Sequence, residues 1–233
     1  MLNPTPYFAA DFFDTRDVTL PRLQKFARFA IQRLTLDNPG KVFDALTTDL
    51  TTYYEALFGS ITAAEAGIGQ RRGSAQLMWG ALADLQHQLE EDEDLIKYKS
   101  KKTPAIRTAF FPNGRKEYAQ ATLLTADKLL DRVSTAATTY ATKLGADFDA
   151  SHYTGFYAAF KEARDGTGAG DEQSAKARAA AETHRSDLTA RLTDAAKLVA
   201  AQFLRDEARA AAYFPTGLLQ APAPAQAGKP GAV

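Results

Sequence analysis

The sequence contains no cysteine, and its charges cancel: 28 Lys and Arg residues stand against 28 Asp and Glu residues in a chain of 233. The missing thiols exclude disulfide bonds, thiol catalysis and cysteine-ligated metal sites. The zero net charge removes the general electrostatic attraction by which proteins bind nucleic acids or anionic membranes. Nucleic acid is therefore not an expected partner.

Long apolar runs are also missing. No stretch approaches the about 20 apolar residues that a membrane-spanning helix needs. The segment Met1–Pro6 lacks the basic and apolar regions of a secretion signal. We therefore expect no membrane insertion and a cytoplasmic location. The 45% hydrophobic content is enough for a sizeable core.

Sustained alternation of apolar and polar residues is missing as well, so the sequence predicts no sheet. Apolar residues recur instead at intervals of three and four, which is typical of helices with one buried face. The stripes of the first half are Leu23, Phe26, Ala27, Ala30 and Leu34; Phe43, Leu46, Leu50, Tyr53, Tyr54, Leu57 and Ile61; and Met78, Leu82, Leu85, Leu89 and Ile96.

Glycine and proline predict the breaks between these helices. Asn38-Pro39-Gly40 interrupts the chain after the first stripe, either as a kink or as a full reversal. The glycines at 67–73 are expected to end the second helix in a loop, and those at 166–170 to form a second such loop. Ser74 and Asp171 are the expected N-caps of the helices that follow.

Pairs of aromatic residues mark an internal repeat. The string Phe110-Phe111-Pro112-Asn113-Gly114 returns as Tyr213-Phe214-Pro215-Thr216-Gly217, an offset of 103 residues (213 minus 110). Five of the six adjacent aromatic pairs fall in this register, which chance does not readily produce. We interpret the chain as a tandem duplication. The stripe 103 residues after the first one is Ala126, Leu129, Leu130, Val133 and Ala137.

Together these patterns predict an all-α fold. We expect an elongated up-down-up-down helical bundle built from two tandem, pseudo-symmetric helical hairpins, each with a kinked or broken first arm. The alternative is six shorter helices in two three-helix units. The expected parts of this one compact domain are an aromatic lead-in packed on the bundle (1–19), a first repeat (20–114), a second repeat (115–217) and a Pro/Ala/Gly-rich tail (218–233).

In the hairpin arrangement the aromatic turns share one end of the bundle, with the glycine loops at the other. Phe110, Phe111, Tyr213 and Phe214 then have two interpretations. They either cap the core or form an exposed apolar end that binds a partner or a second copy.

Charge is segregated in one stretch. The acidic run at 90–94 is followed by a basic run that has no acidic residue among it. The simpler interpretation is a solvated helix whose lysines stabilise its C-terminus. The alternative is a docking surface for an acidic partner, extended by Tyr98, Arg115 and Lys116. The basic run consists of Lys97, Lys99, Lys101, Lys102 and Arg107.

The glycine segment at 67–73 carries Arg71 and Arg72 and precedes a helix, so an anion site at helix N–H groups is conceivable. It follows a helix rather than a strand, and it lacks the Lys-Ser/Thr ending of a phosphate-binding loop. We therefore interpret it first as a loop between helices.

The sequence has three histidines, His87, His152 and His184. None lies in the Glu-x-x-His order of a di-iron bundle, so no metal or other cofactor is expected. Asp92 falls on an apolar stripe, where a buried carboxylate needs a partner. The interpretation that we favour is that this part of the helix projects from the bundle. A ligand- or metal-binding bundle enzyme would use His152, His184, Tyr157 and Asp92.

No catalytic set is visible, so the function that we expect is a non-enzymatic structural or protein-interaction module. A protein partner or self-association is expected. One alternative is a subunit of a homo-oligomer or larger assembly, joined through the aromatic end or the C-terminal tail. The other alternative is the ligand- or metal-binding bundle enzyme.

Overall fold

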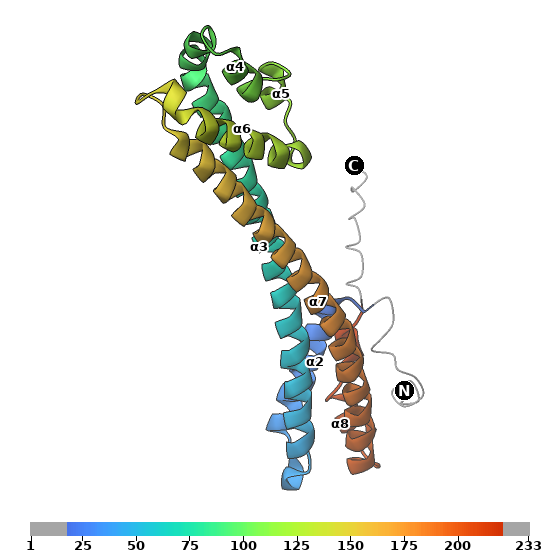
Figure 1. Cartoon of the computed structure of the whole chain (residues 1–233). Coiled ribbons are helices and arrows are strands. Elements are labelled where there is room, and N and C mark those ends of the chain that lie inside the picture. The colour runs from blue at the N-terminus through green and yellow to red at the C-terminus, as the bar shows by residue number, and fades with distance from the viewer. Residues whose placement is uncertain (1–17, 221–233) are drawn as a thin grey trace, which may run out of the picture. The chain divides into compact units, whose positions relative to one another are not determined.

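The computed structural model describes residues 18–220, and within this range it contains helices and turns but no strand. The prediction of an all-α protein is confirmed. Most of the predicted lead-in and tail, residues 1–17 and 221–233, lies outside the described residues. The α-helices are α2 (Leu20–Leu36), α3 (Asp44–Ser100), α4 (Pro104–Phe110), α5 (Lys116–Ala119), α6 (Leu123–Leu144), α7 (Ala150–Gln202) and α8 (Glu207–Ala211), with short 3-10 helices η2 (Pro39–Lys41) and η3 (Thr216–Leu218) (Figure 1).

The chain divides into two compact units. Of the described residues, the first unit contains 18–62 and 177–220, and the second contains Ala63–Lys176. The long helices α3 and α7 each contribute one part to the first unit and one part to the second. Each unit therefore draws residues from both of the predicted repeats.

The first unit is built around α2, whose whole predicted apolar stripe is buried. This stripe packs against the first part of α3, through Leu50 and Leu57, and against the last part of α7, through Leu188 and Leu192. Figure 1 shows α2 beside α3 in this unit. The core thus joins three helical segments that are far apart in the sequence.

The second unit has the same kind of core around α6. Its buried residues include Leu130 and Val133 of α6, Leu85 and Leu89 of α3, and Phe160 of α7. The side-chain contacts between α3 and α7 pair rising residue numbers in one helix with falling numbers in the other, as in Gln88 with His152 and Arg71 with Asp171. The two helices are therefore antiparallel here.

The break at Asn38-Pro39-Gly40 is a reversal of the chain rather than a kink. The Asn38 carbonyl oxygen Oδ1 accepts the Phe43 backbone N–H at 2.9 Å, and its amide donates to Asp44 at 2.6 Å. Gly40 has a φ of +62°, a conformation that glycine adopts without strain. The turn brings α3 back alongside α2 in the same core.

The prediction of two glycine loops is wrong. Helix α3 runs without interruption through residues 67–73, and α7 runs through 166–170. Ser74 and Asp171 accordingly lie inside helices and are not N-caps. A glycine inside a helix costs only about 1 kcal/mol relative to alanine, so favourable packing between helices outweighs it.

That packing is a close contact between the backbones of α3 and α7. A Cβ atom built on Gly67 would lie 2.8 Å from the carbonyl oxygen of Gly170 and 2.9 Å from the backbone nitrogen of Ser174. A Cβ on Gly170 would lie 2.7 Å from the carbonyl oxygen of Gly67 and 2.9 Å from the nitrogen of Arg71. These two glycines are therefore required by helix-to-helix contact and not by a turn.

Within residues 18–220, no helix combines the length and the apolar character that a membrane-spanning segment requires.

The close contact between α3 and α7 at Gly67 and Gly170 predicts that alanine substitutions at two glycines of α3 change stability in opposite directions. Gly67→Ala should lower the free energy of unfolding by about 1–3 kcal/mol, because the added methyl group forces two backbones apart. Gly69→Ala should instead raise it by about 0.5–1 kcal/mol, because alanine favours the helix and a Cβ there meets no atom within 4 Å. Urea unfolding followed by circular dichroism measures both. Equal effects of the two substitutions would contradict the close contact.

Candidate functional site

The aromatic turns lie in separate cores. Phe110 is fully buried in the second unit, where its ring lies 6.0 Å from Phe148 and 6.1 Å from Tyr153. Tyr213 and Phe214 are buried in the core of the first unit. Helices α3 and α7 do not fold back at their glycines, so these aromatic residues contribute to two cores and not to one.

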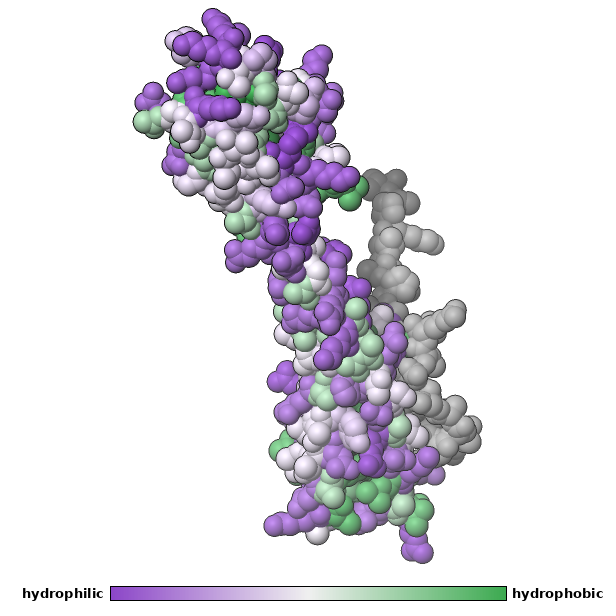
Figure 2. Space-filling view, in the orientation of Figure 1, coloured by the Kyte–Doolittle hydropathy of each residue, from purple (hydrophilic) through white to green (hydrophobic). Residues whose placement is uncertain are grey.

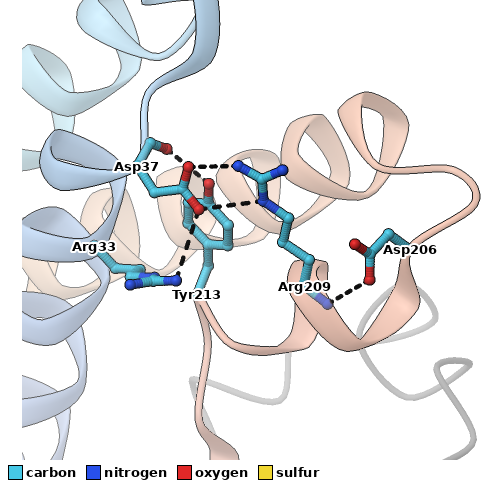
Figure 3. A network of polar contacts seen from close by, with 5 residues as sticks. All are labelled: Arg33, Asp37, Asp206, Arg209 and Tyr213. Carbon is cyan, nitrogen blue, oxygen red and sulfur yellow. Dashed lines mark hydrogen bonds and ion pairs between the residues drawn. The ribbon is translucent and has the colours of Figure 1, made fainter.

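Tyr213 anchors a polar network that ties α8 to the end of α2 (Figure 3). Its hydroxyl donates to the Asp37 carbonyl oxygen at 2.6 Å, and the Arg209 guanidinium donates to both carboxylate oxygens of Asp37, at 2.6 and 3.3 Å. Arg33 approaches the same carboxylate at 3.6 Å, and the Asp206 carboxylate accepts the backbone N–H of Arg209 at 3.0 Å. The hydrogen bond from Arg209 lowers the pKa of Asp37. We interpret this network as structural.

A related arrangement fixes the Phe110 turn of the second unit. The Tyr118 hydroxyl donates to the Phe110 carbonyl oxygen, and Arg132 bridges Tyr118 at 3.0 Å and Glu117 at 2.6 Å. Burial raises the pKa of Tyr118 to about 12. Phe111 is half-buried against the Tyr118 ring.

A pocket of about 290 Å³ opens beside this turn. Leu89, Phe111 and Tyr118 supply its apolar wall, and Arg115 and Lys116 lie among its polar residues. The Arg115 guanidinium already binds the carboxylates of Glu90 and Glu93, each at 2.7 Å. The positive charge of Arg115 is therefore paired with carboxylates of the same chain.

Two of the four residues named for a ligand or metal site come near one another. Asp92 accepts the Tyr153 hydroxyl at 2.7 Å and the Gln88 amide at 3.2 Å. The side-chain oxygen Oε1 of Gln88 lies 3.1 Å from His152 Nδ1. Tyr153 is thus the partner that the Asp92 carboxylate needs, and no short sequence motif points to it.

The other two named residues do not join this chain of hydrogen bonds. His184 belongs to the first unit, and Tyr157 lies one helical turn after Tyr153 on α7. In the described part of the chain, no group of three or more His, Cys, Asp or Glu side chains is placed to hold a metal ion.

The arginines of the glycine segment are helical side chains. Arg71 forms an exposed ion pair with Asp171 of α7 at 3.2 Å, and Arg72 is exposed on α3. The N–H groups around them lie inside α3, where they bond to the carbonyl oxygens of the preceding turn. They are therefore not free to bind an anion.

The lysines of the charge-segregated stretch lie at the C-terminal end of α3, in the second unit. Lys97 and Lys99 lie in the last turn of α3, and Lys101 and Lys102 lie in the turn that follows. In the range 18–220, none of these four lysines takes part in an ion pair within 4.0 Å. The side chain of Tyr98, between the first two, is 63% exposed. We call Lys97, Lys99, Lys101 and Lys102 the lysine end.

The first unit carries an exposed group of apolar side chains at its two turns. Leu36 is 74% exposed, Val42 48% and Leu204 81%, and a Phe43–Phe203 ring contact of 6.4 Å joins the α2–α3 turn to the α7–α8 turn. Figure 2 shows hydrophobic residues gathered where these turns lie. We call Leu36, Val42, Phe203 and Leu204 the apolar end.

Sequence reasoning missed the apolar end. Periodicity assigns apolar residues to buried faces, and it does not show that a helix stops before its last apolar residues are covered. Phe203 and Leu204 lie just beyond Val199, the last buried position of α7, and nothing in the sequence marks them as exposed.

No protein-family model, no curated protein and no solved structure matches this chain. Its function is therefore argued from its own residues alone.

The network in Figure 3 predicts that the Tyr213 hydroxyl contributes to stability. Tyr213→Phe should lower the free energy of unfolding by about 1 kcal/mol through loss of the hydrogen bond to Asp37. Tyr98→Phe, which removes an exposed hydroxyl, is the control and should have no measurable effect. Urea unfolding at pH 7 measures both, and equal losses would contradict the structural role of Tyr213.

The same residue predicts a response to alkaline pH. Burial raises the pKa of Tyr213 to about 12, whereas an unfolded tyrosine titrates near pH ~10. As pH rises through this interval the unfolded chain loses the proton first, so the free energy of unfolding falls. Tyr213→Phe should reduce this fall without abolishing it, because Tyr118 titrates in the same range. An unchanged pH profile would contradict the shifted pKa.

Proposed function

We propose that this protein is a non-enzymatic helical interaction module that pairs with a second copy of itself through the apolar end. The observation that carries the proposal is the exposure of Leu36, Val42 and Leu204, which are 74%, 48% and 81% exposed at two turns that the Phe43–Phe203 ring contact joins. Apolar groups gathered on a surface and surrounded by charge are typical of protein-binding sites.

The fold does not require apolar residues at these turns. The positions 103 residues away from Leu204 and Leu36 are Lys101 and Thr139 (204 minus 103, and 36 plus 103). They lie at the α3–α4 turn and on α6, and both are polar. Under the duplication proposed below, the polar Lys101 is the counterpart of Leu204, which supports a separate role for the apolar end.

The charges around the apolar end favour a second copy as the partner. Lys41 and Arg205 are exposed beside it, and so are Asp44 and Asp206. A two-fold symmetric contact needs a surface that is complementary to itself. An apolar centre with both signs of charge at its rim is compatible with this condition, because a two-fold axis can bring a positive group of one copy opposite a negative group of the other.

We also propose that the chain arose by tandem duplication of a helical unit. In this proposal each compact unit contains helices from both repeats. The spacing of helix starts supports this, because α6 begins 103 residues after α2 (123 minus 20) and α8 begins 103 residues after α4 (207 minus 104). The aromatic cores are also alike, with Phe110 edge-on to Phe148 at 6.0 Å and Tyr213 edge-on to Phe43 at 5.9 Å.

The pairing proposal predicts concentration-dependent dimerisation in sedimentation velocity experiments. Burying one leucine contributes about 1.5–3 kcal/mol, so Leu36→Ser or Leu204→Ser should weaken the dimer by about tenfold or more. Leu124→Ser is the matched control, because Leu124 is 92% exposed in the second unit. It should leave the dimer unchanged.

Two results would contradict pairing through this surface. One is a full-length protein that stays monomeric at every soluble concentration. The other is a dimer that Leu124→Ser weakens as much as Leu204→Ser does. Circular dichroism of each variant verifies that the exposed substitutions leave the helices intact.

A further inference from the structure

The second unit carries a cluster of lysines at the C-terminal end of α3, and the proposed pairing does not involve them. The lysine end occupies the last turn of α3 and the turn after it. Lys99 Nζ lies 3.4 Å from the position of a Cβ built on Gly145, so it reaches the α6–α7 turn. Lys143 stands two residues before this glycine on α6 and is exposed. The lysine end therefore reaches the turn that follows α6, the helix that carries Lys143.

Helix capping does not explain so many lysines. Cations stabilise the C-terminus of a helix through its dipole, an effect confined to the last turn. Helix α7 is similarly long and has no basic residue in its last turn, yet it ends in a corresponding turn before α8. Lys101 and Lys102 moreover follow the last residue of α3. The lysine end thus exceeds what ending a helix requires.

The positive charge is also not paired with carboxylates that lie near it in the chain, since Glu93, one helical turn before Lys97, binds Arg115 instead at 2.7 Å. Asp147 and Asp149 lie in the α6–α7 turn, and Asp149 already accepts the Ser151 backbone N–H at 2.8 Å and lies 3.6 Å from the His152 ring. Like charges held close together repel and destabilise the folded state. Lysines kept at this cost indicate an external anionic partner.

The surroundings favour an acidic polypeptide over a longer polyanion. The acidic run at 90–94 precedes the lysine end on the same helix, and 7 residues from Glu90 to Lys97 span only about 10 Å. A nucleic acid that continued past the lysines would meet these carboxylates, and the zero net charge of the chain adds no attraction. A short acidic segment of a protein avoids this repulsion.

We propose that the lysine end is a docking site for an Asp/Glu-rich segment of a partner protein. The lysine ammonium groups bind its carboxylates, and the exposed Tyr98 ring packs against its side chains. This site is independent of the pairing surface, since it uses other residues in the other unit.

The test measures binding of a fluorescent poly-glutamate peptide to the full-length protein. Replacing Lys97, Lys99, Lys101 and Lys102 by Gln should weaken binding by about tenfold or more, with a smaller dependence on salt. The matched control replaces four scattered exposed lysines by Gln and should change binding less than about twofold, because it alters net charge equally without touching the site. The control lysines are Lys25, Lys128, Lys176 and Lys197.

Thermal unfolding of the two variants gives a second readout. If the lysines are kept for binding, the two variants should have similar melting temperatures, because the lysine-end variant loses the dipole contribution of Lys97 and Lys99 but also loses the repulsion between the lysines. A lysine-end variant that is clearly less stable would show that these residues serve the fold, and would overturn the proposal.

Three further results would overturn it. The first is absence of poly-glutamate binding at low salt. The second is an equal loss of poly-glutamate affinity in the two variants, which would show that only the net charge of the protein matters. The third is tighter binding of a single-stranded DNA of the same charge, or of vesicles containing anionic lipid, which would assign the site to another class of partner.

Discussion

The close approach of two helix backbones at Gly67 and Gly170 is the constraint on which the structure of the second unit depends. A side chain at either position would meet backbone atoms of the other helix at less than 3 Å. Because the helices touch there, α3 and α7 continue through their glycines and do not fold back. Each long helix can then contribute to both cores, and each core joins segments that are far apart in the sequence.

The helical faces were predictable from the sequence, whereas the path of the chain was not. Every residue of the stripe from Leu23 to Leu34 is buried, and so are Met78, Leu85 and Ile96, because spacing alone determines which side of a helix can be covered. The glycines were misread because a local rule gives their cost in a helix but not the contact that compensates it. That contact lies about 100 residues away in the chain, between Gly67 and Gly170 (170 minus 67).

The lysine end and the apolar end also differ in how far the sequence predicts them. The charge segregation of the lysine end was visible in the sequence, since a run of like charge needs no fold to be recognised. The apolar end was not, because the exposure of Leu36 and Leu204 depends on where two helices stop and on the Phe43–Phe203 contact that joins their turns. Tyr153 was missed as the partner of Asp92 for a similar reason, since 61 residues separate them. The two units therefore share a helical plan while presenting different chemistry at their turns.

Amide hydrogen exchange through the glycine segments tests the central claim, the continuity of α3 and α7, most directly. Continuous helices in close contact predict slow exchange at residues 67–74 and 166–171, comparable to that of the flanking helical residues. Glycine-rich loops between separate helices would contradict this account by exchanging fast at these two segments while the flanking residues stay protected.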